Sequence, residues 1–491
     1  MRCMIHGVSD KADRFFGRGS VLSVLADHLE AVVEGQSGRI VAVRGRRQVG
    51  KSTVVERFVE SSSTSYLFAT GVFGASVHQQ LENATLAISE SRRPIPDAAL
   101  LAQSTPASWR EWLGRVAISA RSGPVIVVLD EFPWLTAADR TLEGELQVQW
   151  DRTLEKLPVL LILVGSDVAM MERLATHGRP LFGRLRPLVV PALNPAEIAE
   201  ALPGRSAFEV FDSYLVTGGY PRLVSDLASR RSQTAKDYVR ASLVDAYSPL
   251  VTTARLTLDA EFPDAPTAYQ VLSAIGSDDT ARPGFNDVVS AISDPAERKR
   301  AETATTRALR TLTETKGLIE RELPAWAPQS SKLRRYRVTD PYLRFWFRYV
   351  ERQVDRIARG RSDLAIAHFD RDWSSWRGRS IEPVVRDALQ RLAVSDDNLA
   401  GVESVQPWWV RDGSVEVDVV AASSTATVML GTIKWRAKGG VTTQELDELR
   451  RHRDRVPKSG DALLAAISPG GSPPRGTDLA YTASDLLAAW D

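Results

Sequence analysis

The stretch IVAVRGRRQVGKSTVVERF, residues 40–58, decides the fold of the N-terminal part of this 491-residue chain. Its first residues, 40–44, form an apolar run that predicts a strand, and the residues after Ser52 have the period of an amphipathic helix. Between them, residues 45–52 match the pattern G-x-x-x-x-G-K-[ST] at every fixed position. Glycines let such a loop curl until its backbone N–H groups face phosphate oxygens, and the helix start adds a positive dipole end. The stretch therefore predicts a phosphate-binding loop, or P-loop.

The side chains of this loop predict ATP and Mg²⁺ as cofactors. Lys51 is expected to meet the β- and γ-phosphates, and the hydroxyl of Ser52 is expected to bind Mg²⁺. The complete set of expected nucleotide contacts is Gly45, Arg46, Arg47, Gln48, Val49, Gly50, Lys51, Ser52 and Thr53.

A second motif, PVIVVLDEFPWL at residues 124–135, supplies acids for the same site. Its apolar run predicts a buried parallel strand that ends at Asp130 and Glu131, where such strands face a nucleotide crevice. Asp130 is expected to hold Mg²⁺ through water, and Glu131 to orient and polarise the attacking water. A further predicted strand, residues 65–69, falls between the two motifs. This order fits the additional-strand class of P-loop ATPases, in which the two motif strands are not neighbours.

Two later stretches offer groups that could reach the γ-phosphate. VLLILVGSD, residues 159–167, predicts another buried strand, and Ser166 at its end could act as a sensor of the phosphate. The alternative is a cap for the helix that begins at Val168. RPLFGRLRPLVV, residues 179–190, places Arg184 before the last predicted strand, where it could act in cis or across an interface, so a homo-oligomer is one expectation. A surface arginine is the alternative.

Composition excludes few classes of protein. The chain is 43% hydrophobic and 25% charged, which is ordinary for a protein with a sizeable core, and its net charge is +1. Any basic surface must therefore be local. One cysteine excludes an internal disulfide, and no apolar run approaches the roughly 20 residues that span a bilayer. We expect a cytoplasmic protein with no membrane partner.

Taken in order, the motifs resemble those of the archaeal-type ATPases, which are prokaryotic relatives of the AAA+ and STAND ATPases. The segment YRVTDPYLRFWFRYV, residues 336–350, resembles the start of the C-terminal domain of unknown function that many members carry. The other motifs that carry the resemblance are FFGRGSVLSVL (15–25), GRRQVGKST (45–53), VVLDEFPWL (127–135), LVGSD (163–167), PLFGR (180–184) and TGGYPRLV (217–224).

The resemblance implies roles for several residues. Arg184 takes the arginine-finger-like place, residues 218–222 take the place of the lid motif that closes on the nucleotide, and Arg222 could be a sensor or pack the lid. Residues 16–18 resemble the segment near the adenine, and Gln48 stands where the family often has arginine. The expected domains are a P-loop ATPase core (1–200), a helical lid (201–262), a winged helix (263–347) and a restriction-endonuclease-like domain (365–491).

The middle region predicts a winged helix on its own pattern. ATTRALRTLTETKGLIERELP, residues 304–324, predicts a helix followed by a strand, and RRYRVTD, residues 334–340, predicts the return strand of a wing. Its basic residues could face double-stranded DNA, or belong to a solvated helix or an intramolecular docking face. They are Arg307, Arg310, Lys316, Arg334, Arg335, Arg337, Arg344, Arg348, Arg352, Arg356, Arg359 and Arg361. The aromatic residues of 342–349 are expected in the core because their spacing is helical.

The C-terminal region resembles the restriction-endonuclease-like PD-(D/E)XK fold. Such a site needs carboxylates to hold Mg²⁺ and a lysine to position water. A helix over residues 381–392 supplies Glu382, VEVDVVA (415–421) supplies Glu416 and Asp418, and GTIKW (431–435) supplies Lys434. The acid expected two residues before Lys434 is Thr432, and a hydroxyl is a poor Mg²⁺ ligand beside a carboxylate. We expect a degenerate nuclease site.

These observations predict an α/β protein: a P-loop NTPase of the additional-strand class with a helical lid, a winged helix and a small restriction-endonuclease-like domain. The expected activity is Mg²⁺-dependent ATP hydrolysis that drives a switch on DNA or on a protein partner. The alternatives are an ATP-regulated Mg²⁺-dependent nuclease and a STAND-like scaffold without a nucleic-acid substrate.

Overall fold

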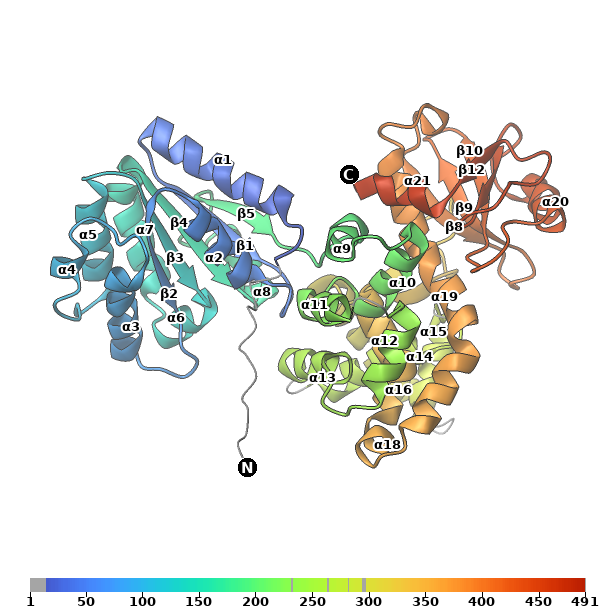
Figure 1. The fold of residues 1–491 in the computed structure, drawn as a ribbon, viewed down its shortest axis with the longest axis horizontal. Helices are drawn as coiled ribbons and strands as arrows, with labels where there is room; N and C mark the ends of the chain where they lie inside the picture. Colours follow the sequence, from blue (N-terminus) through green and yellow to red (C-terminus); the bar gives the residue numbers. More distant parts are fainter. Residues whose placement is uncertain (1–14, 231–232, 263–264, 281, 294–296, 491) are drawn as a thin grey trace, which may run out of the picture. The chain divides into compact units, whose positions relative to one another are not determined.

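The computed structural model describes residues 15–230, 233–262, 265–280, 282–293 and 297–490 (Figure 1). The chain divides into two compact units. The N-terminal unit comprises residues 18–192, and the C-terminal unit comprises the described residues from 193 to 490 together with residues 15–17. Among the described residues, no helix has the length and apolar character needed to cross a membrane.

The N-terminal unit is built on one parallel sheet, as predicted. Its order is β2-β3-β4-β1-β5. The P-loop strand β1 pairs with β4 and β5, while the acid-bearing strand β3 pairs with β2 and β4. The two motif strands are therefore separated by β4, which confirms the additional-strand prediction. The strands are β1 (Arg39–Arg44), β2 (Ser65–Thr70), β3 (Val125–Asp130), β4 (Val159–Gly165) and β5 (Leu185–Val189).

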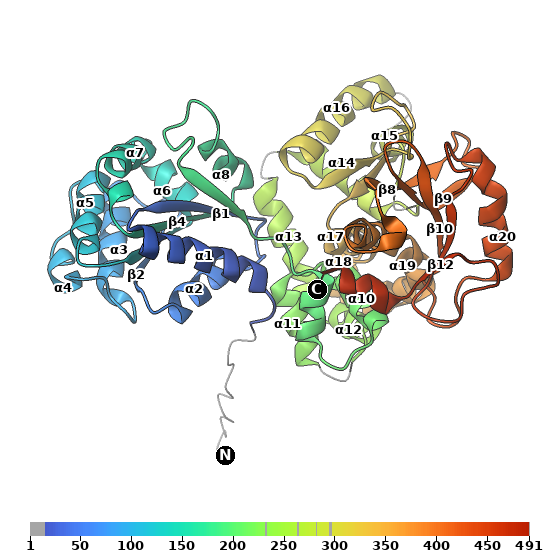
Figure 2. The same cartoon turned by 90° about the horizontal axis from the view of Figure 1, so that it is seen from above.

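Helices cover both faces of this sheet (Figure 2). Alternate strand residues, such as Ile40, Val127 and Leu161, share a core with α3, α5, α6 and α7, because successive strand side chains point to opposite faces. The blue helices α1 and α2 lie over the other face. The helices are α1 (Gly19–Gly35), α2 (Lys51–Ser61), α3 (Val77–Glu90), α4 (Ala98–Leu101), α5 (Trp109–Ala120), α6 (Phe132–Ala138), α7 (Leu142–Arg152) and α8 (Val168–Leu174).

The C-terminal unit begins with helices that share a continuous core with everything that follows them. Phe211 packs edge-on against Trp435, with ring centroids 5.4 Å apart, and Tyr220 packs against Tyr342. The expected lid is thus part of this unit's core, while the finer domain boundaries stay predictions. The helices are α9 (Pro195–Ala201), α10 (Ala207–Thr217), α11 (Pro221–Ser229), α12 (Ala235–Leu243) and α13 (Pro249–Glu261).

The middle region follows the order of the expected winged helix, an assignment that stays a prediction. Helices α14 (Pro266–Ser277), α15 (Phe285–Ile292) and α16 (Arg298–Arg310) precede the antiparallel pair β6 (Ile319–Glu322) and β7 (Arg335–Val338). A single bridge joins Gly284 to Arg335 at the edge of this pair. One π-helical turn, Thr311–Thr315, continues α16.

The aromatic residues after the hairpin are core residues, as predicted. In α17 (Pro341–Tyr349) the side chains of Tyr342, Phe345, Trp346, Phe347 and Tyr349 are all buried. They pack on α19 (Ser362–Leu392), which follows the short α18 (Val354–Ala358). The sequence predicted this helix only over residues 381–392, whereas α19 begins at Ser362, 19 residues earlier. Its first half was missed because its buried aromatic residues, Phe369, Trp373 and Trp376, form a helical stripe among charged residues.

A second sheet, of order β12-β11-β10-β9-β8, closes the C-terminal unit. Strands β8, β9 and β10 form an antiparallel meander, and β11 and β12 add in parallel. Two strands were predicted from their apolar runs, β9 (Glu416–Ala422) and β10 (Thr427–Ile433). The other elements are β8 (Ser404–Trp409), α20 (Thr443–His452), β11 (Leu463–Ile467), β12 (Leu479–Tyr481) and α21 (Ala483–Leu487).

Candidate functional site

The P-loop adopts the tight curl that its sequence predicts. Gln48 and Gly50 have positive φ angles of 63° and 84°, and α2 begins at Lys51. A side chain at Gly45 would clash with the carbonyl of Val190, whose amide is hydrogen-bonded to Arg44, so only glycine fits there. Arg46 and Arg47 lie on the half-exposed rim of the loop, and Thr53 is exposed on α2.

Lys51 is held inside the loop. It is 5% exposed, and its ammonium donates a hydrogen bond of 2.8 Å to the carbonyl of Arg46. Burial lowers the pKa of Lys51 to about 8, although the nearby carboxylates of Glu131 and Asp130 oppose the shift. Its charge is therefore available to phosphates at neutral pH and titrates just above it.

The predicted Mg²⁺ ligands meet at the carboxyl end of β3. The Ser52 side chain is hydrogen-bonded to Asp130, although the two residues are far apart in the sequence. Burial raises the pKa of Asp130, and the bonds from Ser52 and from the backbone of Glu131 offset part of that rise. A hydroxyl and a carboxylate side by side are oxygen ligands of the kind that Mg²⁺ prefers, so the residues fit this ion.

Glu131 and Ser166 come together at the ends of adjacent strands. The hydroxyl of Ser166 donates to the Oε1 of Glu131 at 3.1 Å. Glu131 has a positive φ of 47°, which is uncommon for a residue other than glycine and is the kind of backbone strain that clusters at active sites. The alternative role, capping helix α8, belongs to the next residue: the carboxylate of Asp167 accepts a hydrogen bond from the amide of Met170 at 2.9 Å.

Arg18 has a structural role at this site that the sequence did not predict. Its side chain is 2% exposed and lies against the P-loop. One guanidinium nitrogen donates to the carbonyl of Val49 and another to that of Pro191, each at 2.7 Å. Arg18 thus ties the loop to the segment after β5. The only signal in the sequence was its place in the motif that resembles an adenine-proximal segment.

Arg184 is engaged by a neighbouring helix. Its guanidinium forms a two-pronged ion pair with Asp151 of α7, at 2.6 and 2.7 Å. This pair lowers the pKa of Asp151 below its usual value, because the hydrogen bonds favour the carboxylate. The arginine-finger role of Arg184 stays a prediction.

The lid motif is packed against α17 inside the C-terminal unit. Gly219 has a φ of 73°, and a side chain there would overlap the carbonyl of Leu193. The hydroxyl of Tyr220 donates to Asp340 at 2.7 Å. Arg222 is exposed, and its sensor role stays a prediction. Phe16 lines a cavity of about 300 Å³ in this unit, beside Glu200 and Arg205. Its predicted place near the adenine is untested.

Many basic residues of the predicted stretch form ion pairs or other contacts within the C-terminal unit. Arg335 is 3.0 Å from Glu416, Arg337 pairs with Glu320 and Glu322, and Arg348 is 2.8 Å from Asp372. Others make weaker or local contacts: Arg310 with Glu314, Lys316 with the ring of Phe262, Arg334 with Ser331, Arg352 with Ser277, Arg356 with Gln353 and Arg361 with Asp363. These contacts favour the alternative of an intramolecular docking face for Arg335, Arg337 and Arg348.

The residues of the predicted degenerate nuclease site gather around β9 and β10. Asp418 accepts a hydrogen bond from the hydroxyl of Thr432 at 3.2 Å and from the amide of Ile433 at 2.8 Å. Asp418, Thr432, Lys434 and Glu416 line one small cavity of about 120 Å³. The hydroxyl that replaces the acid is thus a hydrogen-bond donor to the neighbouring carboxylate.

An arginine that the sequence did not reveal lies among these acids. Arg282 is 3.2 Å from Glu382 and contacts Glu416, which also pairs with Arg335. Burial raises the pKa of Glu382 to about 7, with Arg282 and Arg386 opposing and Asp418 assisting. Across the described part of the chain, no group of three or more His, Cys, Asp or Glu is arranged to hold a metal. The charges of Glu382 and Glu416 are compensated by guanidinium groups, while the carboxylate of Asp418 accepts its hydrogen bonds from Thr432 and Ile433.

Comparison with known families agrees with this geometry. Residues 14–162 match the model of the AAA ATPase domain family. The chain carries an AAA ATPase domain. Residues 346–448 match DUF234, described as archaea bacterial proteins of unknown function. The C-terminal region thus contains a domain of unknown function, as the resemblance implied.

Two curated relatives match the chain. The uncharacterized protein MJECL04 of Methanocaldococcus jannaschii is 22% identical over 448 residues, which cover 91% of this chain and 92% of that protein. The uncharacterized protein R02095 of Rhizobium meliloti is 25% identical over 292 residues, which cover 47% of this chain but 27% of that longer protein.

The solved structures with a similar backbone fold include two archaeal proteins. The Walker-type ATPase PABY2304 of Pyrococcus abyssi is 16% identical, with 68% of this chain and 96% of that one covered and a TM-score of 0.47. The ORC2 protein of Aeropyrum pernix, solved in ADPNP–ADP complexes, is 16% identical, with 72% and 96% covered and a TM-score of 0.43.

Proposed function

We propose that the AAA ATPase domain binds ATP with Mg²⁺ at the P-loop and hydrolyses it. The observation that carries this proposal is the assembly at one edge of the parallel sheet. Lys51, the Ser52–Asp130 pair and the Glu131–Ser166 pair all lie there. Ligand sites of open parallel sheets lie at this edge, outside the carboxyl ends of the strands.

Each residue has a role that follows from its chemistry. Lys51 neutralises the β- and γ-phosphates, and the curled backbone donates N–H groups to the same oxygens. Ser52 and Asp130 would hold Mg²⁺, which offsets charge that develops on the phosphates during transfer. Glu131 accepts a hydrogen bond from the attacking water and orients it, and Ser166 fixes the carboxylate that does so.

Hydrolysis drives a switch that acts on a partner, and a protein partner has the better support. Arg335, Arg337 and Arg348 are already paired with acids, so they are poor candidates for phosphate contacts. Glu382 and Glu416 of the nuclease-like region are compensated by Arg282 and Arg335, so the ATP-regulated nuclease has the least support. A STAND-like scaffold is a special case of the protein-directed switch.

Two substitutions test the ATPase. Lys51→Ala should abolish nucleotide binding, because it removes the buried cation of the loop. Glu131→Gln should keep binding and lose hydrolysis, because an amide cannot accept a proton from water. Calorimetry measures the first and phosphate release the second. Phosphate release by Glu131→Gln at the wild-type rate would remove Glu131 from the mechanism.

DNA binding is a second candidate, because helix α16 carries exposed cations that the prediction from sequence only partly identified. Lys299, Arg300 and Arg307 are exposed, and Arg300 and Arg307 are seven residues apart, which places them on one face of the helix. In a winged helix, the helix before the wing is the one suited to enter a major groove. Residues 298–310 are therefore the surface to test, in place of Arg334, Arg335 and Arg337.

A further inference from the structure

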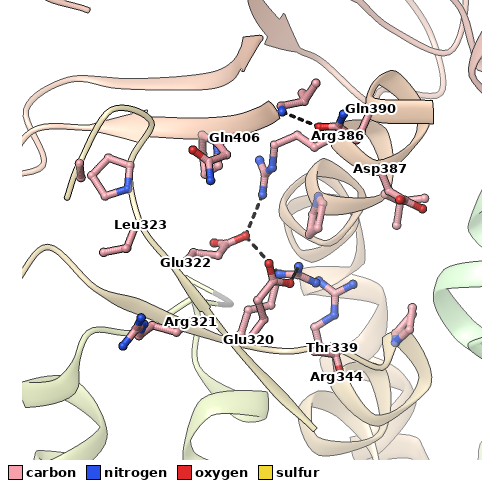
Figure 3. Close-up of a pocket in the computed structure, with 18 of the residues that line it drawn as sticks. Glu320, Arg321, Glu322, Leu323, Thr339, Arg344, Arg386, Asp387, Gln390 and Gln406 are labelled. Carbon is pink, nitrogen blue, oxygen red and sulfur yellow. Dashed lines mark hydrogen bonds and ion pairs between the residues drawn. The ribbon is translucent and has the colours of Figure 1, made fainter. Parts of the chain in front are cut away.

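A cavity of the C-terminal unit adjoins the nuclease-like acids, because Arg386 in its wall lies 3.6 Å from Glu382. Its volume is about 540 Å³, and its walls come from α17, α19, the β6–β7 hairpin and β8 (Figure 3). This volume is within the range of roughly 300–1,000 Å³ that is usual for small-molecule sites. Among the lining residues are Glu322, Arg337, Arg344, Arg386 and Gln406.

Arg344 gives this cavity a buried cation with spare hydrogen-bond donors. Its side chain is 3% exposed, and neither its Nε nor its Nη1 has a hydrogen-bond partner in the described part of the chain. Burial, and then the charge of Arg337, lower the pKa of Arg344 to about 9, so it is still charged at neutral pH. A buried charged donor without a partner is costly, and an oxyanion in the cavity would satisfy it.

Two other arginines of the cavity are already in use. The Oε1 of Glu322 accepts from Arg337 at 3.2 Å and from Arg386 at 3.0 Å, and Arg386 also donates to the carbonyl of Asp418. The two bonds to Glu322, which dashed lines mark in Figure 3, fix its side chain in place. The Oε2 of Glu322 is buried and has no partner among the described residues. The cavity therefore offers free donors on Arg344 and a free acceptor on Glu322.

We propose that this cavity binds a small organic anion that carries a phosphate or carboxylate group together with a hydroxyl or amino donor. The oxyanion pairs with the guanidinium of Arg344, where a planar fork of N–H groups matches two anion oxygens. The hydroxyl or amine donates to Oε2 of Glu322. Phosphate-bearing and carboxylate-bearing ligands share this chemistry, and separate probes distinguish them.

The test uses the full chain with Lys51→Ala, so that the P-loop does not dominate phosphate binding. Inorganic phosphate, AMP and glutamate are titrated separately by isothermal calorimetry. We expect saturable binding of at least one organic probe, AMP or glutamate, which is tighter than that of inorganic phosphate because only the organic probes can also donate to Glu322. AMP binding identifies a phosphate-bearing ligand, and glutamate binding a carboxylate-bearing one. The absence of binding by both organic probes overturns the proposal.

Two further variants locate the site. Arg344→Leu removes the cation, and Gln406→Trp fills the cavity from an exposed position on β8 without removing a charge. Arg344→Leu should weaken binding roughly tenfold or more because it removes charge-assisted hydrogen bonds, which are the strong ones. Gln406→Trp should weaken binding by a similar factor because its ring occupies the space of the anion. Arg310→Ala, an exposed change on α16, should leave binding unaltered. If Arg344→Leu fails to fold, the binding measured with Gln406→Trp tests the proposal instead. Undiminished binding in either folded variant overturns the proposal.

Discussion

The guanidinium of Arg282 lies 3.2 Å from Oε2 of Glu382 and also contacts Glu416, so one arginine bridges two carboxylates. A nuclease of the expected kind would place Mg²⁺ among such acids. Here a cation of the chain itself supplies the compensating charge. Thr432→Glu alone should therefore leave the chain without DNA cleavage, because Arg282 would still occupy the acids.

Arg282→Ala should destabilise the chain by about 3 kcal/mol, the lower end of the range for breaking a buried ion pair, since Glu416 is 31% exposed. In the wild type, burial raises the pKa of Glu382 to about 7 although the charge of Arg282 lowers it. Without Arg282 the pKa of Glu382 is higher still, so the folded variant is stabilised by a bound proton at low pH and loses that stabilisation as the pH rises. The loss should thus be larger at about pH 8 than at about pH 6. Thermal unfolding at both pH values measures it.

Mg²⁺ provides the control for Arg282→Ala. Millimolar Mg²⁺ should raise the melting temperature of the variant more than that of the wild type, because only the variant has uncompensated carboxylates at Glu382 and Glu416, while both proteins keep the Ser52–Asp130 pair. Equal stability of the two proteins would refute the compensating role of Arg282. Mg²⁺-dependent DNA cutting by the wild type that Asp418→Ala removes would overturn the degenerate-site hypothesis.

Ser166→Ala should lower kcat about tenfold with little change in KM, because it frees the carboxylate of Glu131 without touching the P-loop. Asp167→Ala is the matched control at the next position. It removes the cap of α8, so it should cost about 1 kcal/mol of stability and leave kcat close to wild type. If the two variants have the same kcat, Ser166 does not position Glu131.

ATP affinity should fall as the pH rises above about 8, because burial lowers the pKa of Lys51 to about 8. The charged form of Lys51 binds phosphates, so it is fully present below that pKa and is lost above it. Binding should therefore take up a proton at about pH 9. Calorimetry in buffers of different ionisation enthalpy measures this uptake. Affinity that is constant from about pH 7 to about pH 9.5 would contradict the assignment of Lys51.

The double variant Arg300→Glu/Arg307→Glu tests DNA binding by α16. If these side chains meet phosphates, affinity for duplex DNA should fall for all sequences, and the slope of log affinity against log salt should flatten by about 2. Arg359→Glu/Arg361→Glu, which changes net charge equally within the basic stretch, is the control. Equal losses in both double variants would exclude a specific surface on α16. No DNA binding by the wild type would leave the protein-directed switch.

Local patterns in the sequence determined the P-loop unit. Residues 45–52 fix the loop because glycine spacing, a buried strand and a helix start are all local properties. The run before Asp130 identified a buried parallel strand for the same reason, and β4 lies between the two motif strands as that class of sheet requires. The buried aromatics of α17 followed from helical spacing.

Pairings between distant residues were decided only by the tertiary structure. Nothing near Arg282 in the sequence indicates that it meets Glu382, 100 residues later, and the cation density around Arg335 gave no sign that Glu416 neutralises it. Arg18 reaches Val49, and Arg344 faces an open cavity, for the same reason. The sequence shows which charged residues the chain contains. Whether a charge meets solvent, an opposite charge or a cavity depends on long-range packing, because Coulomb energies and desolvation are set by distance and burial.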